Sequence, residues 1–215
     1  MGVRAKICGV STPEAVRAAL DGGAGWVGFM FFPKSPRNVE PEAAARLAQP
    51  LRDGPAKIVA VMVDPSDAEV DRVVQALKPD LIQLHGAETP ARARAIGARA
   101  QAGVIKALPI SESTDLTAAA QYESVAEHLM FEGKPAKDAD RPGGAGQVFD
   151  WTLLSGRRFE RPWFLAGGLD PWNLADAVRQ SGAPLVDVSS GVERGAGLKD
   201  PALIRAFLDA AKSAT

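Results

Sequence analysis

The segment WFLAGGLDPWNLADAVRQSGAPLVDVSSG, residues 163–191, contains one complete repeat of the fold. It opens with an apolar run, Trp163 to Ala166, passes through an amphipathic stretch that closes on Ser181-Gly182, and ends in a second apolar run, Leu185 to Val188. Short apolar runs are typical of strands buried on both faces, and glycine commonly ends a helix before the next strand. The segment therefore predicts a strand, a helix and a second strand parallel to the first.

The same alternation extends along the whole chain. Most of the apolar runs start about 20 to 34 residues apart, which is the length of one βα unit. The predicted strands are Ala5 to Cys8, Trp26 to Phe31, Lys57 to Val63, Leu81 to Leu84, Val104 to Ala107, His128 to Phe131, Trp163 to Ala166 and Leu185 to Val188. Helix starts are expected at Ser11-Thr12-Pro13-Glu14, Asp64-Pro65-Ser66 and Asp200-Pro201.

Eight such units favour an α/β chain folded as one domain over residues 1–215, closed into a (β/α)₈ TIM barrel. An open, doubly wound sheet is the alternative, because periodicity alone does not show closure.

The composition excludes several classes of function. The chain has 215 residues and a formal net charge of −1, with both signs mixed along it, whereas nucleic-acid binding needs a concentrated basic face. No apolar stretch is as long as a signal-peptide core or a membrane span, so we expect a cytoplasmic protein without membrane binding. One cysteine excludes an intrachain disulfide, and two histidines leave little material for a zinc site, so we expect no metal.

Two glycine-containing loops predict a phosphate site. In a barrel, functional groups lie at the C-terminal ends of the strands, and the loops after strands seven and eight often bind phosphate through backbone N–H groups. Gly167-Gly168 and Ser190-Gly191 occupy those two positions. Either pair alone is explained as well by a turn or a strand end, whereas the two together favour phosphate binding.

Cys8 ends the first predicted strand and is followed by Gly9. Residue type alone favours an inert core cysteine. Lys6 lies two residues earlier, on the same side of the strand, and its charge would favour the thiolate. Both interpretations stay open on this pattern.

Four further side chains occupy strand ends or the loops that follow. Glu132 is either a solvated loop carboxylate or an acid at the rim of the sixth strand, across the barrel from the first. Arg37 follows a rigid Pro-Lys-Ser-Pro stretch that would hold its guanidinium ready for a carboxylate. Gln83 and His85 share one face of the fourth strand, where either would also serve to satisfy a buried polar neighbour.

Taken together, these motifs resemble those of the phosphoribosylanthranilate isomerase family, in order and over nearly the whole chain. One such tetrapeptide is weak support, but six motifs in register are strong. The matching segments are Lys6 to Gly9 (KICG), Phe29 to Arg37 (FMFFPKSPR), Gln83 to Gly86 (QLHG), Gly143 to Gly146 (GGAG) with Phe149 to Trp151 (FDW), Ala166 to Leu169 (AGGL), and Asp187 to Glu193 (DVSSGVE).

The resemblance implies a cofactor-free Amadori rearrangement in tryptophan biosynthesis, which turns an aminoaldose phosphate into an aminoketose phosphate. An acid opens the ribose ring, and a base removes the proton from C2 of the sugar. By resemblance, Cys8 is the base, Glu132 stands where the family has its acid, and Arg37 holds the anthranilate carboxylate. The implied phosphate-binding residues are Gly144, Gly146, Gly167, Gly168, Ser190 and Gly191, and the implied supporting residues are Lys6, Gln83, His85 and Asp187.

Two positions depart from the family pattern. The family acid is normally aspartate, and Glu132 is one methylene longer, so we expect the sixth strand or the long segment 133–146 to sit slightly back. If Glu132 turned to solvent, Asp138 or Asp140 would be the carboxylate that replaces it. Ala145 stands where the family often has threonine or serine, which removes one hydroxyl contact.

Other functions compete with this interpretation. An enzyme like the indole-forming synthase would use Lys106 and Glu132 as its acid–base pair. The related isomerase of histidine biosynthesis uses two aspartates, whereas the first strand here ends in Cys8. A barrel that binds a sugar phosphate without turnover is a third possibility. The sequence leaves monomer and homodimer equally open.

Overall fold

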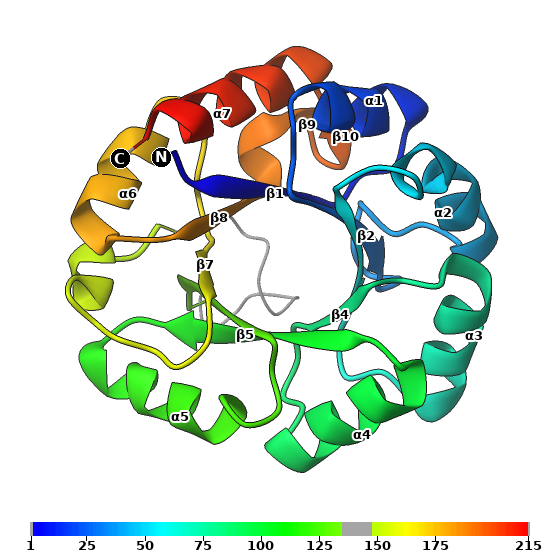
Figure 1. Ribbon diagram of the computed structural model, residues 1–215, viewed down its shortest axis with the longest axis horizontal. Helices are drawn as coiled ribbons and strands as arrows, with labels where there is room; N and C mark the ends of the chain where they lie inside the picture. Colours follow the sequence, from blue (N-terminus) through cyan, green and yellow to red (C-terminus); the bar gives the residue numbers. More distant parts are fainter. Residues whose placement is uncertain (1, 135–147, 215) are drawn as a thin grey trace.

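The computed structural model describes residues 2–134 and 148–214, and its centre is a closed barrel of parallel strands (Figure 1). Strands pair in chain order, and the last closes on the first. They are β1 (Arg4–Cys8), β2 (Trp26–Phe31), β3 (Lys57–Met62), β4 (Leu81–Leu84), β5 (Gly103–Ile110), β6 (His128–Gly133), β7 (Trp163–Leu165) and β8 (Leu185–Val188). The closed ring confirms the predicted (β/α)₈ barrel and excludes the open sheet.

Helices surround this ring (Figure 1). The α-helices are α1 (Pro13–Asp21), α2 (Pro41–Leu47), α3 (Asp67–Leu77), α4 (Pro90–Ala100), α5 (Ala119–Tyr122), α6 (Leu174–Ser181) and α7 (Pro201–Ser213). Short 3₁₀ turns are η1 (Gln49–Leu51), η2 (Ser113–Ala118), η3 (Trp151–Leu154) and η4 (Ser190–Val192). Within the described residues, no helix has the length and apolar character that crossing a bilayer requires.

The predicted helix starts form as expected. Thr12 accepts a hydrogen bond from Ala15 N at 3.3 Å, with Pro13 in the first turn of α1. Ser66 and Glu69 form a reciprocal capping box at the start of α3. Asp200 accepts from Ala202 N at 2.7 Å at the start of α7. Each cap satisfies backbone N–H groups that the first helical turn leaves without partners.

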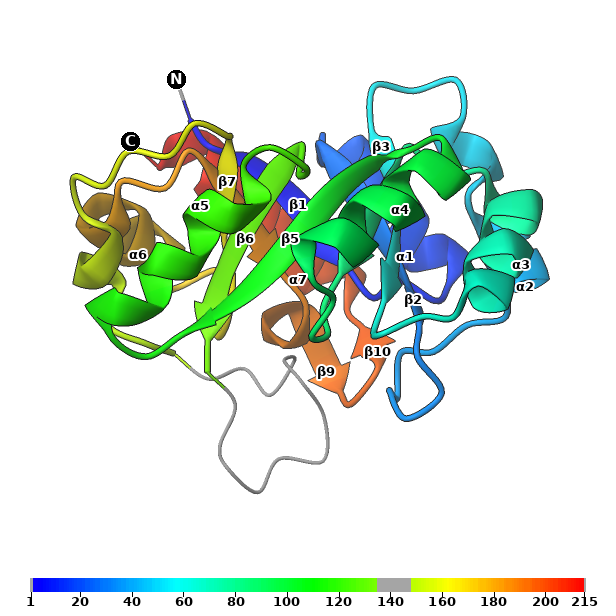
Figure 2. The ribbon, with the colours of Figure 1, turned by 90° about the horizontal axis from the view of Figure 1, so that it is seen from below.

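A hairpin that the sequence analysis did not predict follows β8. It consists of β9 (Glu193–Gly195) and β10 (Leu198–Lys199), which are antiparallel. The hairpin lies at the C-terminal ends of the barrel strands, and both chain termini lie at the opposite face (Figure 2). β5 and β6 also extend beyond their predicted ends at Ala107 and Phe131, because they pair with each other as far as Ile110 and Gly133.

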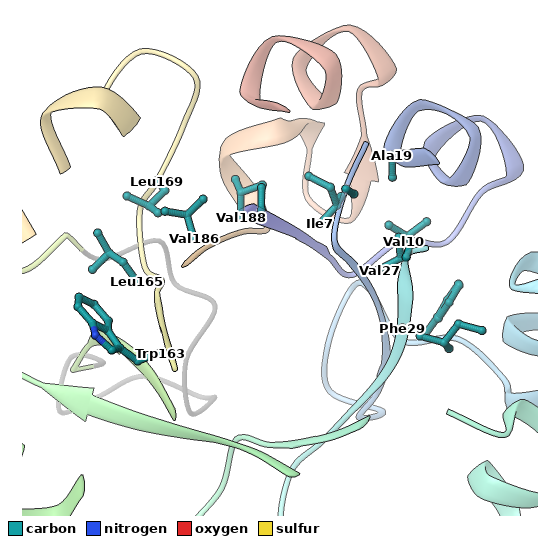
Figure 3. Packing of buried hydrophobic residues seen from close by; sticks show 14 of the residues in the cluster. Ile7, Val10, Ala19, Val27, Phe29, Trp163, Leu165, Leu169, Val186 and Val188 are labelled. Atoms are coloured by element: carbon teal, nitrogen blue, oxygen red, sulfur yellow. The ribbon is translucent and has the colours of Figure 1, made fainter. Parts of the chain in front are cut away.

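Side chains on the strands alternate between the helices and the barrel interior. The outer set, which includes Ile7, Val27, Leu165, Val186 and Val188, is fully buried against the helices (Figure 3). The inner set forms a separate apolar cluster whose members are Cys8, Trp26, Val59, Val61, Leu81, Ile105, Ala107, Met130, Phe164, Ala166 and Leu185. Because side chains alternate along each strand, any polar residue an even number of positions from a member of this inner set also points into the barrel interior.

Aromatic rings fill the interior toward the N-terminal face. The rings of Trp26 and Phe164 meet edge to face at 4.8 Å, and His128 lies 5.6 Å from Trp26 and 5.4 Å from Phe164. The Arg4 guanidinium covers the Trp26 ring at 4.3 Å. Aromatic side chains therefore occupy the N-terminal end of the barrel interior, and the polar interior residues lie toward the C-terminal ends of the strands.

Candidate active site

Four buried polar residues occupy inner positions toward the C-terminal ends of their strands. They are Lys6 on β1, Gln83 on β4, Glu132 on β6 and Asp187 on β8. Cys8 shares the same interior and is 5% exposed. Burying such groups is costly unless they are paired, so their partners decide what the site can do.

Lys6 and Asp187 form a buried ion pair beside Cys8. Lys6 Nζ donates to Asp187 Oδ1 at 2.8 Å, and the Lys6 side chain is fully buried. Gly28 on β2 lies beside Cys8 in register. A Cβ at position 28 would lie 3.2 Å from Lys6 Nζ and 3.3 Å from Cys8 Sγ, so the missing side chain leaves room for both groups.

The surroundings of Cys8 favour its neutral thiol over the thiolate. Burial raises the pKa of Cys8 above its ordinary value, and the neighbouring Asp187 carboxylate raises it further. The Lys6 and Lys199 ammonium groups lower the pKa of Cys8 in part. Burial lowers the pKa of Lys6, but Asp187 and Cys8 together more than offset it, so the pKa of Lys6 is raised. Lys6 is therefore a fixed positive charge, available to stabilise a thiolate when one forms.

Glu132 is buried at the end of β6, with 6% of its surface exposed, and points toward β4. His85 Nε2 lies 2.5 Å from Glu132 Oε1, and Gln83 Nε2 lies 3.1 Å from His85 Nδ1. The interpretation of Glu132 as a solvated loop carboxylate is therefore wrong. Asp138 and Asp140 lie outside the described residues.

His85 and Glu132 form a short, buried hydrogen bond. Burial by itself lowers the pKa of His85, but Glu132, with a smaller contribution from Asp187, outweighs it, so the pKa of His85 is raised above its ordinary value. The raised pKa favours the protonated imidazole, which is placed to pass a proton to the carboxylate. Gln83 and His85, predicted to share one face of the fourth strand, lie within hydrogen-bond distance of each other.

Arg37 is held by a carboxylate that the sequence analysis did not single out. Its Nε donates to Glu193 Oε1 at 2.7 Å, and its Nη2 donates to Glu193 Oε2 at 2.9 Å. Gly9 makes room for the Arg37 stem, since a Cβ at position 9 would lie 2.6 Å from Arg37 Cδ. A guanidinium carries five N–H groups, so the remaining ones, on Nη1 and Nη2, still offer a forked face to a second carboxylate.

Lys199 is the second residue that the sequence analysis missed. It lies on β10 with its side chain fully buried, and its Nζ donates to Glu193 Oε1 at 2.6 Å. The same ammonium donates to the Ser189 carbonyl at 2.8 Å. The available signal was the pair of glycines, Gly195 and Gly197, between Glu193 and Lys199, which is typical of a tight hairpin.

The loops after β7 and β8 pack directly on each other. Gly167 and Gly168 have φ values of 85° and 66°, which strongly favour glycine. A Cβ at Gly191 would lie 1.9 Å from Leu169 O, so only glycine permits this approach. Ser190 opens the short turn η4. The two predicted glycine loops are therefore adjacent in space, whereas Gly144 and Gly146 lie outside the described residues.

Lys106 does not enter the site. Its neighbours Ile105 and Ala107 belong to the inner cluster, so Lys106 faces outward from β5. There its Nζ donates to Glu88 Oε2 and to the Gly86 carbonyl, both at 2.7 Å. The alternative that pairs Lys106 with Glu132 as acid and base is wrong, because the barrel wall separates them.

Comparison with known proteins agrees with this geometry. The profile of the N-(5'-phosphoribosyl)anthranilate (PRA) isomerase family matches residues 5–210. The chain belongs to the phosphoribosylanthranilate isomerase family. The family resemblance drawn from the motifs, an isomerase of tryptophan biosynthesis on a TIM barrel, is thereby confirmed.

Relatives in this family cover almost the whole chain. An N-(5'-phosphoribosyl)anthranilate isomerase of Caulobacter sp. (strain K31) is 63% identical over 98% of this chain and 99% of its own length. One from Caulobacter vibrioides is 62% identical over 98% of this chain and 96% of its own. The match therefore extends beyond the motifs to the helices that surround the barrel.

Solved structures of phosphoribosylanthranilate isomerases have the same architecture. The Thermotoga maritima enzyme is 35% identical, with a TM-score of 0.87, over 98% of this chain and 99% of that one. Another isomerase structure, 31% identical with a TM-score of 0.81 over 98% and 99% of the two chains, contains reduced 1-(o-carboxyphenylamino)-1-deoxyribulose 5-phosphate. A further Thermotoga maritima structure is of monomers generated from the dimeric isomerase.

Proposed function

We propose that this chain converts N-(5'-phosphoribosyl)anthranilate to 1-(2-carboxyphenylamino)-1-deoxyribulose 5-phosphate without a cofactor, with Cys8 as general base and Glu132 as general acid. The observation that carries the proposal is the placement of these two residues. Cys8 on β1 and Glu132 on β6 point into one polar interior from separate parts of the barrel wall, and each has a buried partner that can adjust its protonation. Acid–base isomerisation requires that arrangement.

Glu132 starts the reaction in this proposal. His85, at 2.5 Å, passes a proton to the Glu132 carboxylate. The carboxyl group so formed gives that proton to the ribose ring oxygen, the C1–O bond breaks, and the nitrogen lone pair forms a C1=N Schiff base. His85 is thus a supporting residue that supplies the proton to the acid. Gln83 orients His85 through a hydrogen bond to its second ring nitrogen.

Cys8 completes the reaction. Its thiol first loses its proton to solvent, and the resulting thiolate takes the proton from C2 of the sugar. The C–H electron pair becomes the C1=C2 bond of an enolamine while the C=N pair returns to nitrogen. Protonation at C1 and loss of the hydroxyl proton at C2 then give the ketone. Lys6 supports the thiolate by its charge, and Asp187 fixes Lys6 in place at 2.8 Å.

The ends of the substrate have separate anchors in this proposal. Arg37 binds the anthranilate carboxylate through the N–H groups that Glu193 leaves available. Backbone N–H groups of Gly167, Gly168, Ser190 and Gly191 bind the phosphate, and the close packing at Gly191 supports this because it brings both loops to one point. Gly144 and Gly146 complete the phosphate site in the proposal.

A base that must remain a free thiol suits a reducing compartment, which supports a cytoplasmic location. The family includes a dimeric Thermotoga maritima enzyme. For this chain, monomer and homodimer remain the two assemblies to separate by sedimentation.

The decisive experiment adds purified protein to freshly prepared N-(5'-phosphoribosyl)anthranilate and follows the loss of the substrate's fluorescence. We expect rapid loss with the native chain and a severe reduction with Cys8→Ala. Full turnover by Cys8→Ala would refute Cys8 as the base. Tight binding without any turnover by the native chain would instead support the sugar-phosphate-binding barrel.

A further inference from the structure

We propose that Lys199 is a positioning residue for the isomerisation, because it keeps the Arg37 cluster positively charged and fixes the backbone next to Cys8. This inference rests on the roles given to Arg37 and Cys8 in the proposed function. Lys199 itself does not need to touch the substrate.

All the hydrogen-bonding capacity of the Lys199 ammonium is directed at the site. Nζ donates to Glu193 Oε1 at 2.6 Å, to the Ser189 carbonyl at 2.8 Å and to Ser189 Oγ at 3.2 Å. An ammonium group has three N–H donors, and here each has a partner. The side chain has no exposed surface, so these contacts are not exchanged for water.

The charges of the cluster explain why the second cation is needed. Glu193 binds both Arg37 and Lys199, so two positive groups share one negative group. One net positive charge remains, and it matches a single substrate carboxylate. Without Lys199, Glu193 would neutralise Arg37 completely, and a second carboxylate would bind there against repulsion from Glu193.

The contact of Lys199 with Ser189 connects it to Cys8, the candidate base. Ser189 Oγ accepts from Lys199 and donates to the Cys8 carbonyl at 3.3 Å. This chain of contacts holds the end of β1 against the loop after β8. Lys199 therefore links the group that binds the carboxylate to the group that moves the proton.

The charge of Lys199 also reaches the thiol. Burial raises the pKa of Cys8, whereas Lys6 and, to a smaller extent, Lys199 lower it. The other titratable or charged groups of this interior are Asp187 on β8, Arg37 and its partner Glu193 on β9, His85 directly after β4, and Glu132 on β6.

The first test measures ligand binding, which does not depend on turnover. Two ligands are compared by calorimetry: reduced 1-(o-carboxyphenylamino)-1-deoxyribulose 5-phosphate and the same molecule without the carboxyl group. In Lys199→Met we expect Kd for the first ligand to rise about tenfold or more, and Kd for the second to change little, because only the first needs the extra charge. Lys199→Arg should restore most of the binding, and Lys212→Met, an exposed lysine on α7, should match the native chain.

The second test measures the thiol directly, since Cys8 is the only cysteine. The pH dependence of its alkylation by iodoacetamide gives its pKa in each variant. We expect Lys199→Met to raise the pKa of Cys8 and Glu193→Gln, which removes a negative charge, to lower it. Disturbed packing would not produce opposite shifts from two neighbouring substitutions.

Equal weakening of both ligands, or thiol shifts of the same sign, would overturn the proposal and leave Lys199 with a structural role only. Circular dichroism and thermal melting confirm that each variant is folded. If Cys8→Ala keeps full turnover, the proposed base is wrong, but the ligand comparison still decides the role of Lys199.

Discussion

Gly28 on β2 lies beside Cys8 on β1, and a Cβ at Gly28 would lie 3.3 Å from Cys8 Sγ and 3.2 Å from Lys6 Nζ. The approach is tighter than most Cβ contacts, but the neighbouring atoms are the ends of side chains and not backbone. A substitution at this position therefore changes the site without breaking the strand.

We expect Gly28→Ala to fold with a loss of at most about 1–3 kcal/mol in stability, because small overpacking is tolerated at that cost. Its kcat should fall about tenfold or more, since the thiol and the ammonium must move apart. Gly25→Ala is the matched control, because its Cβ would meet the Arg4 guanidinium at 3.3 Å near the N-terminal face. Equal kcat values for both variants would contradict this account.

Glu132→Gln should lose about 10²–10⁴ in kcat, which is the usual contribution of a general acid. Glu132→Asp should retain part of the activity, because it keeps the carboxyl group but withdraws it from His85. Steady-state kinetics measure both variants against Glu127→Gln, which alters an exposed carboxylate just before β6. If Glu132→Gln were as active as Glu127→Gln, another group would have to protonate the ring oxygen.

The two histidines should titrate on opposite sides of the ordinary imidazole pKa of about 6.5. Burial lowers the pKa of His128, whereas Glu132 raises the pKa of His85 against the opposing effect of burial. Proton NMR of the imidazole C2–H signals measures both, and His128→Gln assigns them by removing the signal with the lower pKa. Two pKa values on the same side of 6.5 would contradict the contact between His85 and Glu132.

The same shifts have consequences for stability. The contribution of His85 is fully present below its unfolded pKa of about 6.5 and is lost as pH rises through its raised folded pKa. The contribution of His128 is present above its unfolded pKa and is lost as pH falls through its lowered folded pKa. Urea unfolding of His85→Gln and His128→Gln across this range should therefore give difference curves of opposite slope. Parallel curves would show that the shifts are not as described.

Gly191→Ala should raise KM and weaken inhibition by inorganic phosphate, because its Cβ would lie 1.9 Å from Leu169 O and must push the loops after β7 and β8 apart. The control is Gly54→Ala, where the nearest atoms are 3.6 Å from the added Cβ. An unchanged inhibition constant for phosphate in a folded Gly191→Ala protein would place the phosphate elsewhere.

Lys106→Met should affect stability more than catalysis. It leaves the buried Glu88 carboxylate without its cation, and breaking such a pair costs about 3–5 kcal/mol. Urea unfolding should show this loss, while kcat of the folded fraction stays close to the native value. The double variant with Glu88→Gln should recover part of the stability, and a large fall in kcat for Lys106→Met would restore the lysine-based mechanism.

Much of the site was predictable because strand ends can be found from periodicity. The site residues lie where the alternation predicts, at or near the C-terminal ends of the barrel strands. They are Cys8, Gln83, His85, Glu132 and Asp187. The partners of these residues were not predictable in the same way. Lys6 and Asp187 are 181 residues apart in the chain, and only the closure of β8 on β1 brings them together.

The missed residues have a different explanation. Glu193 and Lys199 lie in a hairpin of very short strands, and the apolar alternation that reveals longer strands cannot develop over two or three residues. Their function also depends on Arg37, which comes 156 residues earlier than Glu193. No local pattern connects two such segments.

The sequence alone predicted eight βα units, because strict alternation of apolar strands and amphipathic helices has few other solutions, and its motifs indicated the family. Closure of the sheet into a barrel was observed only in the structure. Only the tertiary structure decided which charges meet. It paired Lys6 with Asp187 inside the barrel and Lys106 with Glu88 outside it, placed His85 against Glu132, and gave Glu193 two cationic partners, Arg37 and Lys199. The physical reason is that the face of a strand follows from a period of two along the chain, whereas the pKa of a buried group depends on neighbours that chain folding alone brings within a few ångströms.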